Sequence, residues 1–172
     1  SGAPCSRHAR LYWLGRYVER AENTARLISV NNNLMLDLPN SADGIWESLL
    51  EILATGAEFR ARYNSVSERN VIRWVLAEDA NGSSLVSSLR AARENSRTVR
   101  EVMPSEAWEL INDLFWSAQE GAESALARKS RPGYLEQIVR KSQQFAGMLQ
   151  NTMSHREPYQ FIMLGATLER MD

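Results

Sequence analysis

Two pairs of carboxylates have the spacing to share one face of a helix. Glu19 and Glu22 stand three residues apart near the start of the chain, and Glu169 and Asp172 repeat that spacing at its end. Buried carboxylates with raised pKa values can act as general acid and base, which makes Glu19 and Glu169 the candidates for such chemistry. An arginine directly follows each of these glutamates, however, and a neighbouring positive charge favours the ionised carboxylate.

A carboxylate metal site is a second chemistry to consider. Di-iron helical bundles combine glutamates with Glu-x-x-His pairs on facing helices. Neither carboxylate pair is accompanied by a histidine, and the chain has only His8 and His155. The arginines beside the carboxylates would also repel a cation. We therefore expect no metal and no cofactor.

Nucleophilic catalysis has little support in the sequence. The single cysteine, Cys5, stands in the N-terminal tail, and the chain has no Gly-x-Ser-x-Gly motif and no phosphate-binding loop. His155 lies shortly before Pro158 in a polar stretch, where we expect a loop residue and not a base. No nucleophile is assigned.

Four arginines form a third set of charged residues. They recur at steps of three and four, each one position after a seam residue of a predicted helix: Arg90, Arg93, Arg97 and Arg100. Three interpretations stay open. The arginines meet the carboxylates of the first and last helices in a partly buried network, they form a solvated face with local pairs, or they bind an anion or a partner.

The elements that must position these residues are helices. Apolar residues recur every three or four positions, most regularly from Leu11 to Met35, and no alternating strand pattern competes. The segments are separated at Pro39, 79–84, Pro104 and a turn at 131–133. We predict an all-α antiparallel bundle of six or seven helices, over about residues 11–35, 46–63, 67–75, 85–103, 104–125, 135–149 and 158–172.

Composition excludes several classes of protein. The 172 residues include 20 Lys and Arg against 21 Asp and Glu, a net charge of −1, whereas a nucleic-acid binder needs a basic excess. No apolar run approaches the length of a membrane span, and no secretion signal opens the chain, so we expect a cytoplasmic protein. Residues 1–5 are predicted to be a tag remnant or disordered tail, and residues 6–172 one helical domain.

The first and last predicted helices share a sequence. Residues 14–22 and 164–172 match at an offset of 150, with coincident Gly, Glu and Arg and coincident apolar positions. A glycine inside a helix costs about 1 kcal/mol relative to alanine, so finding Gly15 and Gly165 at one place predicts a close helix–helix approach there. The two Glu-Arg motifs comprise Gly15, Glu19, Arg20 and Glu22, and Gly165, Glu169, Arg170 and Asp172.

These motifs resemble the Alpha-E domain, a bacterial helical domain of unknown function with a repeated Glu-Arg motif. The matching stretches are residues 6–23, 88–101 and 155–172, in family order. Family domains are longer and continue past the second motif, so the resemblance implies that this chain is the N-terminal part of a longer helical domain, truncated at its C-terminus. Ala166 and Thr167 depart from the Arg16-Tyr17 pair of the first motif.

The resemblance also implies a setting. Family members occur in gene clusters or fusions with ATP-grasp ligases and transglutaminase-like proteins, which are the implied partners, together with a peptide. The leading hypothesis is a non-catalytic partner or binding module in an ATP-grasp amidoligase system for peptide synthesis. The alternative is an enzyme of that pathway acting on amide bonds, with Glu19 and Glu169 as acid and base. A third expectation is a homodimer that completes the bundle core.

Overall fold

The computed structural model describes residues 4–172 and confirms the all-α class. Within this range there are eight α-helices and no strand, so the predicted number of six or seven helices is slightly low. Three short 3-10 helices, η1 (Pro39–Ser41), η2 (Arg100–Val102) and η3 (Ser124–Leu126), lie between them. The α-helices are α1 (Pro4–Asp37), α2 (Ala42–Ile52), α3 (Gly56–Arg62), α4 (Glu68–Leu76), α5 (Leu85–Thr98), α6 (Ser105–Gly121), α7 (Arg131–Met153) and α8 (Glu157–Met171).

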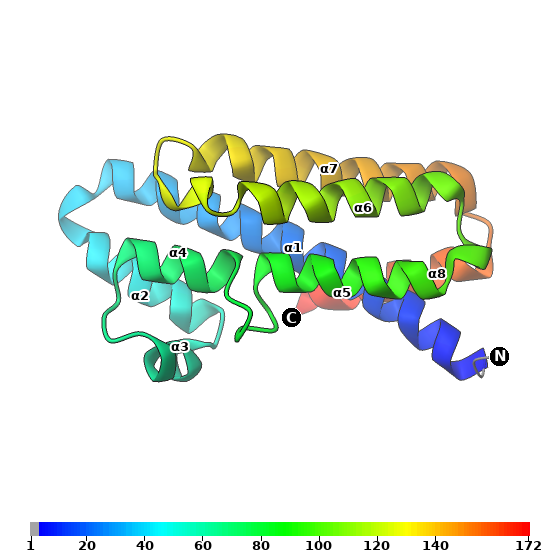
Figure 1. Ribbon diagram of the computed structural model, residues 1–172, viewed down its shortest axis with the longest axis horizontal. Coiled ribbons are helices and arrows are strands. Elements are labelled where there is room, and N and C mark those ends of the chain that lie inside the picture. The colour runs from blue at the N-terminus through cyan, green and yellow to red at the C-terminus, as the bar shows by residue number, and fades with distance from the viewer. Residues whose placement is uncertain (1–3) are drawn as a thin grey trace.

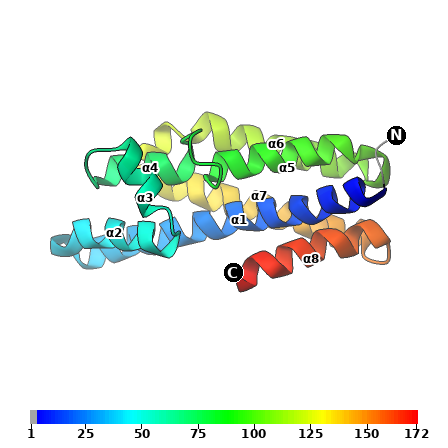
Figure 2. The ribbon, with the colours of Figure 1, turned by 90° about the horizontal axis from the view of Figure 1, so that it is seen from below.

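The long helix α1 is the centre of the bundle (Figure 1). It packs against α5, α7 and α8, and against α2 near its C-terminal end. Helices α5, α6 and α7 alternate in direction. Helix α1 runs antiparallel to α5 and α7. Helix α8 turns back after α7 and runs beside the N-terminal half of α1 in the same direction (Figure 2). The first and last helices therefore lie side by side and parallel.

The apolar seam of α1 explains its central position. Leu11, Leu14, Ala21, Ala25 and Ile28 are each at most 1% exposed. With Val18, which is 7% exposed, they recur at steps of three and four and so share one stripe of the helix, and this stripe faces the neighbouring helices. The seam that the sequence predicts over α1 is confirmed.

The predicted helix over residues 46–63 is wrong, because the chain breaks between α2 and α3. Ala54 adopts the left-handed conformation with φ 53°, the position where a helix end usually has glycine. The N–H of Thr55 donates to the carbonyl of Leu50 at 3.2 Å, and the N–H of Ala54 donates to that of Glu51 at 3.0 Å. These two bonds form a Schellman motif, which satisfies the end of α2 and redirects the chain into α3.

Other boundaries also differ from the prediction. α5 ends at Thr98, and η2 follows where a continuous helix to residue 103 was expected. α7 begins at Arg131, where a turn was expected, because Pro132 is tolerated in the first turn of a helix. Both differences arise at helix ends, where local sequence signals are weakest.

The described chain begins within the first turn of α1. Residues 1–3 of the predicted tail, and the side chain of Cys5, lie outside the described residues, whereas the backbone of residues 4 and 5 belongs to α1. No helix in the described range is both long enough and apolar enough to cross a lipid bilayer.

Candidate functional site

The two motif glycines lie where α1 and α8 approach most closely. A methyl group on Gly15 would lie 1.9 Å from the carbonyl oxygen of Ile162, and one on Gly165 would lie 1.9 Å from that of Tyr12. Both distances are impossible for real atoms, so only glycine permits the approach that the repeat predicts. Residues 12 and 162 are themselves equivalent in the repeat. The contact is therefore reciprocal, as across a two-fold axis that runs along the helices.

Ion pairs repeat the same symmetry. Arg20 Nε donates to Glu169 Oε1 at 2.8 Å, and Arg170 Nε donates to Glu19 Oε1 at 2.6 Å. Each Glu-Arg motif thus supplies the partner of the other, and the side chains of Glu19 and Glu169 are only 10% and 11% exposed. We call this arrangement of two glycines and two crossed ion pairs the clasp.

One further arginine makes the clasp asymmetric. Arg16 Nε donates to Glu169 Oε2 at 2.8 Å, and its guanidinium also contacts the Asp172 carboxylate. The hydroxyl of Tyr12 accepts a third bond from Arg16 at 2.9 Å. Ala166 stands at the equivalent position of α8 and can make no such contact.

The electrostatics hold Glu169 in its ionised form. Burial would raise the pKa of the Glu169 carboxyl, but hydrogen bonds from Arg20 and Arg16 outweigh burial and bring this pKa below its usual value. The same hydrogen bond to Glu169 raises the pKa of Arg16, and the bond to Glu19 raises that of Arg170. Glu169 therefore carries no proton that it could donate near neutral pH.

The carboxylates of the two Glu-Arg motifs line two different cavities. Glu19 and Glu22 face a cavity of about 510 Å³ between α1, α7 and α8, which we call the Glu19 cavity. Glu169 and Asp172 face a cavity of about 420 Å³ on the other flank of α1, toward α2. Acid–base catalysis by Glu19 and Glu169 requires them to share a pocket, and the structure separates them.

The predicted arginine cluster lies on α5 and η2, beside α6. The guanidinium of Arg93 lies 5.5 Å from the ring of Trp108, 5.4 Å from Phe115 and 5.7 Å from Trp116. Its Nε donates to Asn112 Oδ1 at 2.7 Å. Such cation–π stacking fixes the guanidinium while leaving its charge at the surface.

The other three arginines of that cluster pair with nearby carboxylates or stack on the same aromatic residues of α6. Arg90 pairs with Asp79 at 3.1 Å, and Arg97 pairs with Glu94 one turn away. Arg100 lies 4.9 Å from the ring of Trp108 on α6. A Glu–Arg network of the first and last helices does form, but its arginines come from the motifs themselves and not from α5.

A buried cluster around Arg131 was missed by the sequence analysis. Arg131 is 0% exposed and donates to the carbonyl oxygens of Ala125 and Leu126, each at 2.8 Å. Its Nη1 donates to Asn32 Oδ1 at 2.8 Å and to Glu68 Oε1 at 2.7 Å. The Pro-Gly that follows Arg131 resembles a turn and hid its role as the first residue of α7.

The two histidines, the remaining candidates for chemistry, lie outside the clasp. His8 lies 2.9 Å from a carboxylate oxygen of Glu157 and stacks on Phe161 at 4.3 Å, and His155 is exposed in the connection between α7 and α8. Within the described part of the chain, no group of three or more His, Cys, Asp or Glu residues is placed to hold a metal ion.

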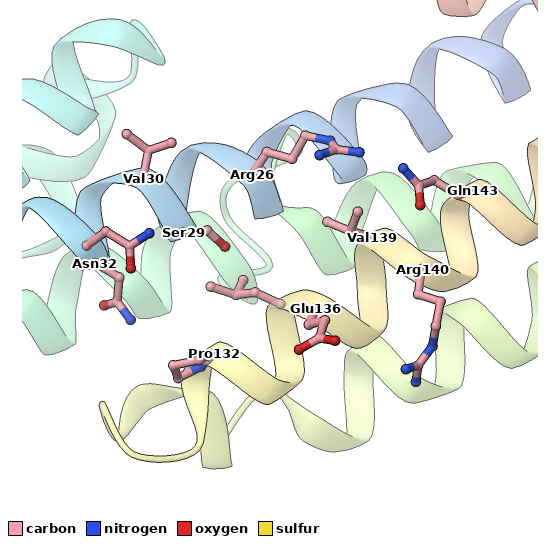
Figure 3. A pocket seen from close by; sticks show the side chains of 11 residues that line it. Arg26, Ser29, Val30, Asn32, Pro132, Glu136, Val139, Arg140 and Gln143 are labelled. Carbon is pink, nitrogen blue, oxygen red and sulfur yellow. The ribbon is translucent and has the colours of Figure 1, made fainter.

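A groove lies between α1 and α7 (Figure 3). It has a volume of about 790 Å³ and is lined by Arg26 and Val30 of α1 and by Val139 and Arg140 of α7. Gln143 lines both this groove and the Glu19 cavity, so the two adjoin. Its lining includes a single carboxylate and brings no catalytic pair together.

Comparison with known protein families identifies the family of this chain. A family model named Alpha-E, described as a predicted alpha-helical domain with a conserved ER motif, matches residues 5–172. No match was found among curated proteins or among solved structures. Glu-Arg occurs at 19–20 and at 169–170, and both occurrences lie in the clasp. Since the match covers almost every residue, the chain belongs to the Alpha-E family.

Proposed function

We propose that this Alpha-E chain is a non-catalytic partner or binding module of an ATP-grasp amidoligase system that makes peptides. The observation that carries the proposal is that the glutamates and arginines of the two motifs neutralise each other's charges. Glu19 is held by Arg170 at 2.6 Å, and Glu169 is held by Arg16 and Arg20, both at 2.8 Å. Ion pairs of this kind hold helices together, and the lowered pKa of Glu169 leaves it without a proton to donate, which disfavours the alternative of an amide-cleaving enzyme.

The surface formed by α5 and α6 supports a binding role. The side chain of Arg97 is 56% exposed, Trp116 is 40% exposed, and the guanidinium of Arg93 lies 5.7 Å from the Trp116 ring. Arginine and tryptophan are enriched where proteins bind partners, because both combine a large contact area with directed polar groups. We expect this surface to contact the ligase or the carboxylates of its peptide product.

An ATP-turnover assay tests the proposal. A purified ATP-grasp ligase from a gene cluster that encodes an Alpha-E protein is assayed with and without the chain. We expect the chain to change the rate of ATP turnover and the double variant Arg97→Glu/Arg100→Glu to abolish the change, because charge reversal repels an acidic partner surface. The matched control is Arg69→Glu on α4, whose side chain is 63% exposed and lies outside the proposed surface.

Thermal unfolding of each variant shows whether it is folded. An equal loss of effect with Arg69→Glu would mean that the response follows total charge and not this surface. If wild-type chain leaves turnover unchanged and no complex with the ligase forms in analytical ultracentrifugation, the proposed function is wrong.

A further inference from the structure

The Glu19 cavity occupies the place where the two-fold relation of the clasp would put a second Arg16. On one flank, Arg16 bridges Glu169 and Asp172. The equivalent acceptors on the other flank are Glu19 and Glu22, and both line the cavity. The residue equivalent to Arg16 is Ala166, which lines the same cavity with only a methyl group. The space that a guanidinium fills on one flank is thus open on the other.

The carboxylates on the open flank are held by arginines at the surface of the protein. Within the described residues, Glu19 and Glu22 each receive two hydrogen bonds, from Arg170 and Arg26, whereas Glu169 receives three and Asp172 receives one. Arg170 and the Glu22 partner Arg26 are 56% and 51% exposed, so water screens them. Arg16 is 17% exposed. A carboxylate can accept about four hydrogen bonds, which leaves capacity on Glu19 and Glu22.

A buried hydroxyl in the cavity provides an independent indication of a ligand. Ser142 is 0% exposed, lines the Glu19 cavity, and its Oγ has no hydrogen-bond partner within the described residues. A buried polar atom without a hydrogen-bond partner costs about 1–3 kcal/mol, so such atoms usually bind a protein group, a water molecule or a ligand. Apolar side chains of Phe145, Leu149 and Met163 form another part of the lining.

We propose that the Glu19 cavity binds an alkylguanidinium group. The guanidinium takes the position that Arg16 takes on the other flank and donates to Glu19 and Glu22. The alkyl stem lies along Leu149 and Met163. This inference is independent of the proposed partner function, because it needs neither the α5–α6 surface nor a ligase.

Calorimetric titration of the chain with N-butylguanidinium tests the proposal. The neutral isostere N-butylurea serves as the ligand control, and we expect it not to bind, because it lacks the charge that pairs with a carboxylate. Ala166→Arg should supply the guanidinium from the protein itself, which blocks binding and raises the unfolding temperature. The matched control Thr167→Arg adds the same charge to the neighbouring, exposed position outside the cavity and should still bind.

A second variant protects the test if Ala166→Arg fails to fold. Glu22→Gln removes one acceptor and should weaken N-butylguanidinium binding by about tenfold or more. Equal binding of N-butylguanidinium and N-acetyl-arginine amide would identify a peptide arginine as the source, and binding of the free compound alone a small molecule. Absence of binding to wild type at millimolar concentration, or unchanged binding in both Ala166→Arg and Glu22→Gln, overturns the proposal.

Discussion

Glu169 acts as an electrostatic cross-link between the first and last helices. Its two carboxylate oxygens receive hydrogen bonds from Arg16 and Arg20 on successive turns of α1. The side chain is 11% exposed, so the pairs are shielded from water on most sides. A charge in such a place is costly to remove, because its partners stay behind without an anion.

Glu169→Gln should lower the free energy of unfolding by about 2 kcal/mol at neutral pH, because it leaves two guanidinium groups without a counter-charge. It should also change the response to acid. The folded-state pKa of Glu169 is depressed, so its contribution is complete above the unfolded pKa of about 4.3 and disappears as pH falls through the lower, folded value. Urea unfolding from neutral to acidic pH measures both effects.

The control for this prediction is Glu94→Gln, which removes an i,i+3 pair whose side chains are 55% and 56% exposed. Exposed pairs contribute little, so this variant should unfold at nearly the wild-type urea concentration. Equal acid dependence of wild type and Glu169→Gln below about pH 4 would contradict the assignment.

At the scale of helices, the crossing of α1 and α8 depends on two glycines. Gly15→Ala should destabilise the protein by about 3 kcal/mol, because its methyl group would overlap the Ile162 carbonyl and force the helices apart. Urea unfolding gives the free energy, and amide hydrogen exchange should show α8 opening more readily than α6.

Gly147→Ala is the matched control, since Gly147 also lies within a helix but a methyl group there has nothing within 4 Å. It should stabilise the protein by about 0.5–1 kcal/mol through the ordinary preference of helices for alanine. If both substitutions stabilise, the close approach of α1 and α8 is not a constraint on the fold.

The sequence reveals this crossing because the repeat places a costly glycine twice at one phase. It does not reveal the partners of the α5 arginines, because the side on which α6 packs depends on helix order and crossing angles that no periodicity encodes. The end of α2 is hidden for a different reason. Ala54 adopts a conformation typical of glycine, and nothing in its residue type announces that.

At the scale of the whole molecule, Arg131 joins parts that are distant in the sequence. Its guanidinium binds Asn32 of α1, Glu68 of α4 and two carbonyls of η3, and it lies 5.8 Å from the ring of Trp46 on α2. Long-range contacts of this kind depend on the completed fold, so a local motif could not have predicted them.

Arg131→Met should destabilise the protein by about 4 kcal/mol, because it leaves buried carbonyl groups and Glu68 without their donor. Arg128 also binds Glu68 but is 63% exposed, so Arg128→Met is the matched control and should change stability far less. Thermal and urea unfolding compare the two. Similar effects from both substitutions would show that the buried bonds of Arg131 do not stabilise the fold.

The clasp also has a consequence for synthesis of the protein on the ribosome. The two halves of the clasp are 150 residues apart, and translation at about 5–20 residues per second separates their appearance by roughly 8–30 s. During that interval the nascent α1 presents Gly15, Arg16 and Arg20 without the helix that covers them. α1 must therefore remain accessible while the intervening helices assemble, and docking of α8 is a late, post-assembly event in the biogenesis of the bundle.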